Sequence, residues 1–292
     1  LRSLAVAHLL GHELLGEHDQ TFSLLERLLV HAETTANYIV YHGAGRDAYD
    51  IPGRTVHEAI FNLNDGKFRC PSTQQGYSPF STWTRGLAWI ITGFAEELEY
   101  IDSLDAVDAR NASVFDACGG KDAVVKRFLD VARMCADFHI KNSCTDGIPY
   151  WDTGAPGLEH MGDWRARASE PYNEYEPVDS SAAAISAQGL LRLGEYLGAH
   201  GDSEAGGRYT MAGIGMLETL LDEPYISIDD AHQGLLLHSV YHRPNGWDRI
   251  PEGRRIPCDE SCMWGDYHIR EAVLLLDRLI KQQPYYVFWR LT

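Results

Sequence analysis

The helical character of this chain is clearest in residues 24–36, which read LLERLLVHAETTA. The apolar side chains recur at intervals of three and four residues, at Leu24, Leu25, Leu28, Leu29, Ala32 and Ala36. This spacing places them on one face of an α-helix, where they can pack against a core. The pattern predicts a helix over about residues 21–41.

Similar patterns on either side of this stretch predict six more helices, over about residues 4–15, 82–100, 121–140, 179–197, 207–221 and 261–282. Ser81 or Thr82 is the expected N-cap of the helix ending near residue 100, and Asp179 or Ser180 that of the helix ending near 197. Strand-like alternation is confined to short pieces near residues 55–61 and 234–238. The sequence therefore predicts an all-α fold whose long loops carry functional residues.

Composition limits the possible partners and cofactors. The 292 residues carry a formal net charge of −17, which disfavours nucleic acid and anionic membrane surfaces as partners. No run approaches about 18 consecutive apolar residues, so no transmembrane helix is predicted. No P-loop, dinucleotide-binding, zinc-protease or serine-hydrolase motif is present, and we expect no metal and no organic cofactor.

The cellular compartment and the oligomeric state stay open. No signal peptide is visible, whereas Asn111-Ala112-Ser113 fits a glycosylation sequon. We expect a cytoplasmic protein, with secretion as the alternative. The six cysteines include no C-x-x-C pair, so we expect free thiols or at most one disulfide.

A cluster of polar and aromatic residues between Gln75 and Trp89 carries the chemistry. It contains Gln75, Trp83, Arg85 and Trp89 around a turn that opens a helix. An arginine pairs well with a carboxylate, and a tryptophan can stack on a sugar ring, so the cluster indicates a receptor for a carboxylated sugar. The alternative is that these residues are ordinary core and capping residues.

A wider set of motifs follows in order along the chain. It consists of His57, QGYSP (75–79), WTRGLAW (83–89), GIPYWD (147–152) with Ala155-Pro156, DSSAAA (179–184), GLL (189–191), GLLLH (234–238), Tyr241-His242 and DESCMWGDY (259–267). In this order the motifs resemble the unsaturated glucuronyl hydrolases, glycoside hydrolase family 88, over residues ~57 to ~282. The related family 105 usually reads closer to R-G-N-G-W, so Ala88-Trp89 favours family 88. Leu87 departs from the glutamine that family 88 often has there.

The resemblance implies a fold and a reaction. The family fold is an (α/α)6 barrel, so we expect one barrel domain over residues 1–292, incomplete in the chain as given because helices N-terminal to Leu1 are missing. Family members hydrolyse unsaturated uronyl oligosaccharides, the products of polysaccharide lyases. An acid protonates C4 of the C4=C5 double bond, water adds at C5, and the hemiketal collapses to release the uronic acid. The expected partner is therefore an anionic unsaturated oligosaccharide.

The resemblance also assigns substrate-binding residues: His57, Gln75, Trp83, Arg85, Trp89, Ser261 and Trp264. His57 and Gln75 are expected to contact sugar hydroxyls or the attacking water, and Arg85 to bind the substrate or shape the pocket. Trp83 and Trp89 form the pocket wall, while Ser261 and Trp264 help to seat the carboxylate. Purely structural roles stay open as alternatives. His57 could be a hydrogen-bonded loop residue, and Asp152 could either line the site or close a turn. The same holds for residues of the last motif: Trp264 and Tyr267 as core packing, and Asp259, Glu260 and Asp266 as caps of the final helix.

The catalytic acid is the main gap. The family has two essential aspartates N-terminal to the His57 position, and the acid/base begins an inner helix where this chain has Leu1–Val6. In one register Arg2 occupies its place, and in another the acid is the residue just before Leu1. We favour the register in which the acid lies just before Leu1. The alternative, in which Arg2 replaces the acid, would make the protein a pseudoenzyme that binds uronides. A third interpretation is a different (α/α)6 sugar enzyme, such as a family 105 hydrolase, a glucuronidase or an epimerase.

The polysaccharide that supplies the substrate is not determined. Loops near residues 46–54, 157–173 and 243–255 are expected to discriminate between sources. The last of these contains Arg243, Arg249, Arg254 and Arg255. These arginines indicate a rim that reads sulfate or carboxylate, with an ordinary solvated loop as the alternative.

Overall fold

The computed structural model describes residues 1–104 and 108–290, and this part of the chain is mainly α-helical, as predicted. Its helices are α1 (Arg2–Leu9), α2 (Leu24–Tyr38), α3 (Thr84–Ser103), α4 (Ala109–Ala117), α5 (Lys121–Lys141), α6 (Ser180–Ala199), α7 (Ser203–Leu220) and α8 (Met263–Ile280). Two antiparallel hairpins accompany them, β1 (Glu13–Leu15) with β2 (Thr21–Ser23) and β3 (Glu58–Phe61) with β4 (Phe68–Ser72).

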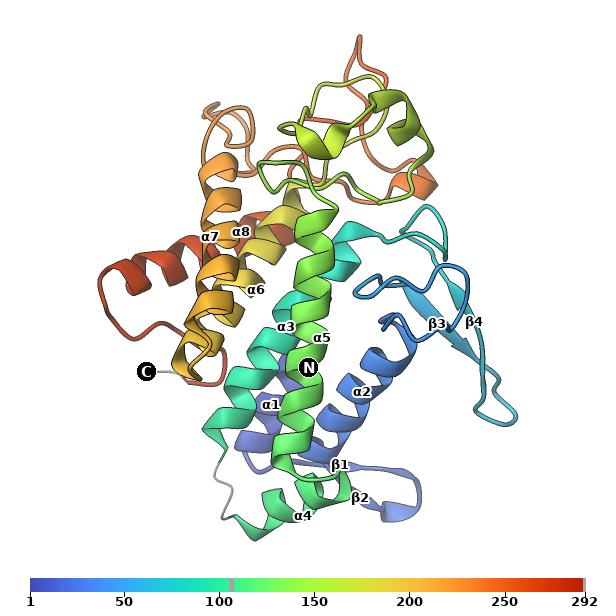
Figure 1. Ribbon diagram of the computed structural model, residues 1–292, viewed down its shortest axis with the longest axis vertical. Coiled ribbons are helices and arrows are strands. Elements are labelled where there is room, and N and C mark those ends of the chain that lie inside the picture. Colours follow the sequence, from blue (N-terminus) through green and yellow to red (C-terminus); the bar gives the residue numbers. More distant parts are fainter. Residues whose placement is uncertain (105–107, 291–292) are drawn as a thin grey trace.

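Helices α5, α7 and α8 pack around α3 and α6 (Figure 1). Helices α3 and α6 are buried on nearly all sides and pack against each other, while α5 covers α3 and α7 covers α6. Helix α8 packs against α6, and α2 packs against α1. The close approach of α6 to α3 depends on Gly189, since a Cβ there would lie 2.7 Å from the Thr92 hydroxyl.

The loops that precede α3, α6 and α8 meet at one end of the helices (Figure 1). Main-chain hydrogen bonds join them: Thr84 N–H donates to the Trp151 carbonyl, Ser180 N–H to that of His238, and Ser239 N–H to that of Glu260. Three segments far apart in sequence thus form one continuous surface, which carries most of the predicted site.

Two helix boundaries differ from prediction at the N-terminal end. The helix expected over 4–15 ends at Leu9, because Gly11 adopts φ 76° and the chain turns into β1. The helix expected from residue 21 begins at Leu24, where the Ser23 hydroxyl accepts the Glu26 N–H. Residues 21–23 instead pair with β1.

The expected helix caps had mixed outcomes. Asp179 is the N-cap of α6, as predicted, and accepts the N–H groups of Ser181 and Ala182. The prediction of a cap for α3 at Ser81 or Thr82 was wrong: Trp83 occupies that position, and the Thr82 hydroxyl donates to the Thr55 carbonyl instead. Helix α4 was not predicted, and residues 234–238 contribute only a bridge between Ile226 and Leu236.

The six cysteines are unpaired thiols. Within residues 1–104 and 108–290, no helix has the length and apolar character needed to cross a membrane.

Candidate functional site

Arg85, at the start of α3, is the centre of the site and is 3% exposed. Its Nη1 donates to Asp179 Oδ2 at 3.2 Å and to the Val240 carbonyl. Its Nη2 donates to Gln75 Oε1 at 3.1 Å and to the Tyr241 carbonyl at 2.8 Å. Both terminal nitrogens therefore have protein acceptors. Of the two roles expected for Arg85, binding the substrate or shaping the pocket, these contacts favour the second.

Two indole rings enclose this guanidinium. The Arg85 Cζ lies 4.8 Å from the ring centroid of Trp83 and 4.9 Å from that of Trp264. Trp264 Nε1 donates to Ser181 Oγ at 3.2 Å, and that hydroxyl donates to Asp179 Oδ1 at 2.5 Å. The wall of the site is thus fixed by a buried ion pair and a chain of hydrogen bonds.

His57 adjoins Trp83, with ring centroids 4.7 Å apart in an edge-to-face arrangement. Its Nδ1 accepts the N–H groups of Gln74 at 3.0 Å and Gln75 at 3.2 Å. These bonds assign the ring proton to Nε2. Burial lowers the pKa of His57, so the ring is a neutral hydrogen-bond donor through Nε2 at neutral pH.

Asp152 holds the loop that carries Gln75. It is fully buried, and its Oδ2 accepts the Tyr77 N–H at 2.9 Å while Oδ1 accepts the Gly154 N–H at 2.9 Å. Burial raises the pKa of this carboxyl. These contacts close turns and position the loop. Of the two roles expected for Asp152, a site residue or a turn residue, they match the second.

The structure brings His57, Gln75, Trp83, Arg85 and Trp264 together, but Trp89 lies apart from their hydrogen-bond network. Trp89 is one turn further along α3, and its ring meets that of His268 edge to face at 5.0 Å. Both line a cleft of about 360 Å³ that also reaches Leu1 and Arg2.

The cleft beside Leu1 contains glutamates that the sequence motifs did not single out. Arg2 is ion-paired with Glu96 and, at 3.1 Å, with Glu271. Glu97 also lines the cleft, and one of its buried oxygens has no partner among the described residues. Burial raises the pKa of Glu97 to about 8. The available sequence signal was the run of acidic residues at Glu96, Glu97 and Glu99, which follows the apolar turns of the same helix.

A second cleft, of about 300 Å³, is lined by Trp264. Ser261 lines it, and its hydroxyl is buried without a partner among the described residues. Tyr241 and Trp247 line it too. The sequence motifs included Tyr241 only as part of the resemblance and did not include Trp247, because isolated aromatic residues in loops carry no periodic signal.

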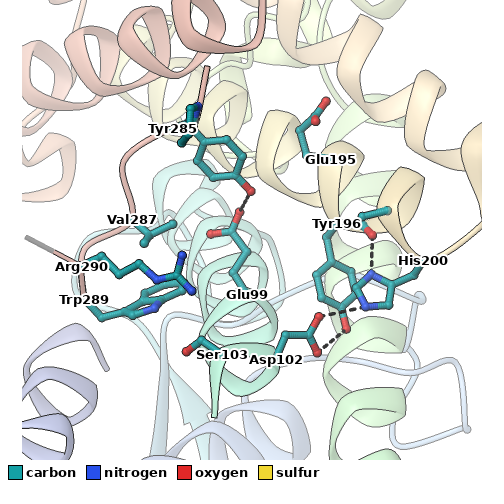
Figure 2. A pocket seen from close by; sticks show the side chains of 12 residues that line it. Glu99, Asp102, Ser103, Glu195, Tyr196, His200, Tyr285, Val287, Trp289 and Arg290 are labelled. Carbon is teal, nitrogen blue, oxygen red and sulfur yellow. Dashed lines mark hydrogen bonds and ion pairs between the residues drawn. The ribbon is translucent and has the colours of Figure 1, made fainter. Parts of the chain in front are cut away.

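A third cleft, of about 410 Å³, lies at the C-terminal ends of α3 and α6 (Figure 2). Arg85 is at the opposite, N-terminal end of α3. There the Tyr285 hydroxyl donates to Glu99 at 2.8 Å, and Asp102 lies 2.9 Å from His200 Nε2. The segment after α8 forms one side of this cleft, which holds none of the predicted site residues.

No protein-family model matches the chain. It is 29% identical over 225 residues to an unsaturated glucuronyl hydrolase of Bacillus sp. strain GL1, a match that covers 77% of this chain and 47% of that relative. It is 25% identical over 226 residues to an unsaturated glucuronyl hydrolase of Formosa agariphila, covering 77% and 44%. The chain thus spans about half the length of these curated relatives.

Solved structures agree with these sequence matches. The unsaturated glucuronyl hydrolase of Bacillus sp. GL1, described as responsible for the degradation of glycosaminoglycan, matches with a TM-score of 0.58 and 26% identity over 88% of this chain and 57% of that one. An unsaturated glucuronyl hydrolase specific for heparin matches in fold, with a TM-score of 0.61, 20% identity, and coverage of 89% and 58%. The chain is therefore a homologue of the unsaturated glucuronyl hydrolases, with the helical architecture of their (α/α)6 barrel.

Proposed function

We propose that the whole protein hydrolyses unsaturated uronyl oligosaccharides by hydration of the C4=C5 double bond. The supporting observation is the convergence of His57, Gln75, Trp83, Arg85 and Trp264 from separate loops at one end of the helices. A solved structure of an unsaturated glucuronyl hydrolase (UGL) variant with the oligosaccharide dGlcA-Glc-Rha-Glc also matches this chain, with a TM-score of 0.58 and 26% identity.

In this proposal each residue has a role set by its contacts. His57 donates from Nε2 to a sugar hydroxyl or to the attacking water, and Gln75 lies beside it. The indoles of Trp83 and Trp264 form the walls of the site. Arg85 packs between these two rings and also donates a hydrogen bond to the Val240 carbonyl. Ser261 supplies a hydroxyl next to Trp264. We assign Trp89 to a wall of the adjoining cleft.

We place the acid/base carboxyl at the N-terminal end of α1, beside Leu1 and Arg2. Leu1 and Arg2 share their cleft with Trp89 and His268, so a carboxyl there would adjoin the predicted sugar wall. The acid must hold its proton near the working pH, and partial burial in this cleft next to Glu97 would raise the pKa of such a carboxyl.

The test is to incubate the protein with an unsaturated uronyl disaccharide and follow the ultraviolet absorbance of the conjugated C=C–COO⁻ group. We expect loss of absorbance, abolished in Arg85→Ala and reduced at least tenfold in kcat/KM for His57→Ala. The exposed His31→Ala is the matched control and should retain full activity. Hydrolysis of a saturated glucuronide at a comparable rate would instead assign the protein to the glucuronidases.

A uronide-binding protein without turnover is the second candidate. The observation in its favour is that Arg2 occupies the cleft beside Leu1, where it is paired with Glu96 and Glu271. In this case calorimetry would detect binding of the disaccharide while the absorbance of the wild-type mixture stays constant.

A further inference from the structure

Three aromatic rings form a row that leads from Arg85 to the solvent. Tyr241 lies beside both Trp264 and Trp247, with ring centroids 5.6 Å and 5.7 Å apart and interplanar angles of 31° and 28°. Trp264 contacts the buried Arg85, whereas Tyr241 is 49% exposed and Trp247 60% exposed. The row therefore begins in the candidate site and ends in an accessible indole.

The exposed rings are held by buried polar contacts. The Asp248 carboxylate accepts hydrogen bonds from the main-chain N–H groups of Tyr241 and His242. The Arg85 guanidinium donates hydrogen bonds to the carbonyls of Val240 and Tyr241. The loop is therefore fixed before any ligand arrives, and little conformational entropy is lost when a ligand stacks on it. An ordered, exposed tryptophan next to a polar cleft is typical of a binding surface.

The cleft beside the row has the chemistry of a site for one sugar ring. Its volume of about 300 Å³ is small for a ligand site, and its lining combines the aromatic rings with a few polar groups. The Glu260 carboxylate can bind sugar hydroxyls, and it is itself held by the Arg249 N–H at 2.7 Å.

The charges around this cleft disfavour an anionic occupant. Glu260 contributes a negative charge, and none of the described residues that line the cleft is a lysine or arginine. Two of the four arginines expected to form a rim are engaged elsewhere. Arg254 lies over Tyr172 at 4.3 Å, and Arg255 lies 3.6 Å from Glu174. A sulfated or carboxylated sugar would meet the Glu260 carboxylate, with no lysine or arginine among the described lining residues to offset the repulsion.

The geometry points to this cleft as the binding site of the sugar attached to the unsaturated uronyl residue, and to that sugar being an uncharged pyranose stacked along Tyr241 and Trp247. The inference rests on the proposed function, because that function makes an oligosaccharide the substrate. It adds Trp247 as the residue that determines specificity for the second sugar.

The experiment compares two substrates: an unsaturated uronyl disaccharide with a neutral second sugar, and the methyl glycoside of the unsaturated uronic acid, which lacks that sugar. In Trp247→Ala we expect KM for the disaccharide to rise roughly tenfold, since an aromatic stack is lost. The kcat/KM for the methyl glycoside should not change. Trp247→Phe should recover most of the loss. Tyr286→Ala, which removes another exposed ring in the segment after α8, should have no effect.

The outcomes separate this inference from the proposed function. Normal turnover of the disaccharide by Trp247→Ala overturns the inference and leaves the function standing. If wild type turns over neither compound, the function fails, and calorimetric titration of both compounds decides the inference. The inference is supported if Trp247→Ala binds the disaccharide more weakly than wild type does but binds the methyl glycoside as well as wild type. It is overturned if the variant and wild type bind the disaccharide equally, or if wild type does not bind the disaccharide.

The preference of this cleft for an uncharged sugar can be measured separately. Wild type should prefer a disaccharide with an unsulfated second sugar to its sulfated counterpart, and Glu260→Gln should narrow that preference. A wild-type preference for the sulfated compound would overturn the assignment of an uncharged sugar.

Discussion

Glu97 shows how one buried carboxyl makes stability depend on pH. Burial raises its pKa in the folded state to about 8, from an ordinary value of 4.5. The folded state therefore favours the protonated form of Glu97. The contribution of this group to the free energy of unfolding is complete below pH 4.5 and is lost as the pH rises through 8.

We expect the free energy of unfolding to fall by a few kcal/mol from this group between pH 4.5 and 8, since one pKa unit corresponds to about 1.4 kcal/mol. Glu97→Gln should flatten this slope, as measured by urea denaturation across the range. Glu218→Gln, at an exposed position on α7, should keep the wild-type slope. Equal slopes in wild type and Glu97→Gln would show that Glu97 ionises normally in the folded protein.

At the scale of an element, the N-terminus of α6 joins helix capping to the candidate site. Asp179 is fully buried, caps α6 through Ser181 and Ala182, and lies 3.2 Å from the Arg85 guanidinium. Its removal would leave a buried guanidinium without its counter-ion, which typically costs about 3–5 kcal/mol.

We therefore expect Asp179→Ala to destabilise the protein by about that amount in urea denaturation. Asp179→Asn retains the cap but not the charge, and should recover part of the loss. Ser23→Ala, which removes the cap of α2, is the comparison for capping alone and should cost about 1 kcal/mol. If the two alanine variants lose equal stability, the Arg85 pair contributes nothing beyond the cap.

At the scale of the whole molecule, the segment after α8 closes the end of the helices opposite Arg85 (Figure 2). The Tyr285 hydroxyl donates to Glu99, and Arg192 donates both to Glu99 at 2.9 Å and to the Tyr286 carbonyl at 3.3 Å. These contacts join α3, α6 and the C-terminal segment through buried charges.

Tyr285→Phe should leave a Glu99 oxygen unpartnered and cost about 1–3 kcal/mol. Amides in residues 285–290 should exchange hydrogen faster, while those at the Arg85 end of α3 and α6 stay protected. Tyr286→Phe removes only an exposed hydrogen bond to Arg278 and should change stability by less than about 0.5 kcal/mol. Unchanged exchange in Tyr285→Phe would mean that other contacts hold this segment.

The sequence by itself determined the helical class, several helices and most residues of the candidate site. Apolar spacing located α2 and α5, because one buried face leaves a periodic record in the sequence. Asp179 signalled the start of α6 in the same local way, and the motif WTRGLAW contained Trp83 and Arg85.

Only the tertiary structure decided what these side chains do. No local pattern shows that both terminal nitrogens of Arg85 find acceptors in three segments of the chain. Nor does any local pattern show that Trp89 lines another cleft, or that Trp247 continues the row of rings from Trp264. Such contacts join residues far apart in the chain, and their geometry is set by how α3, α6 and α8 pack. Local propensity fixes an element, whereas packing between elements fixes the distances on which binding and ionisation depend.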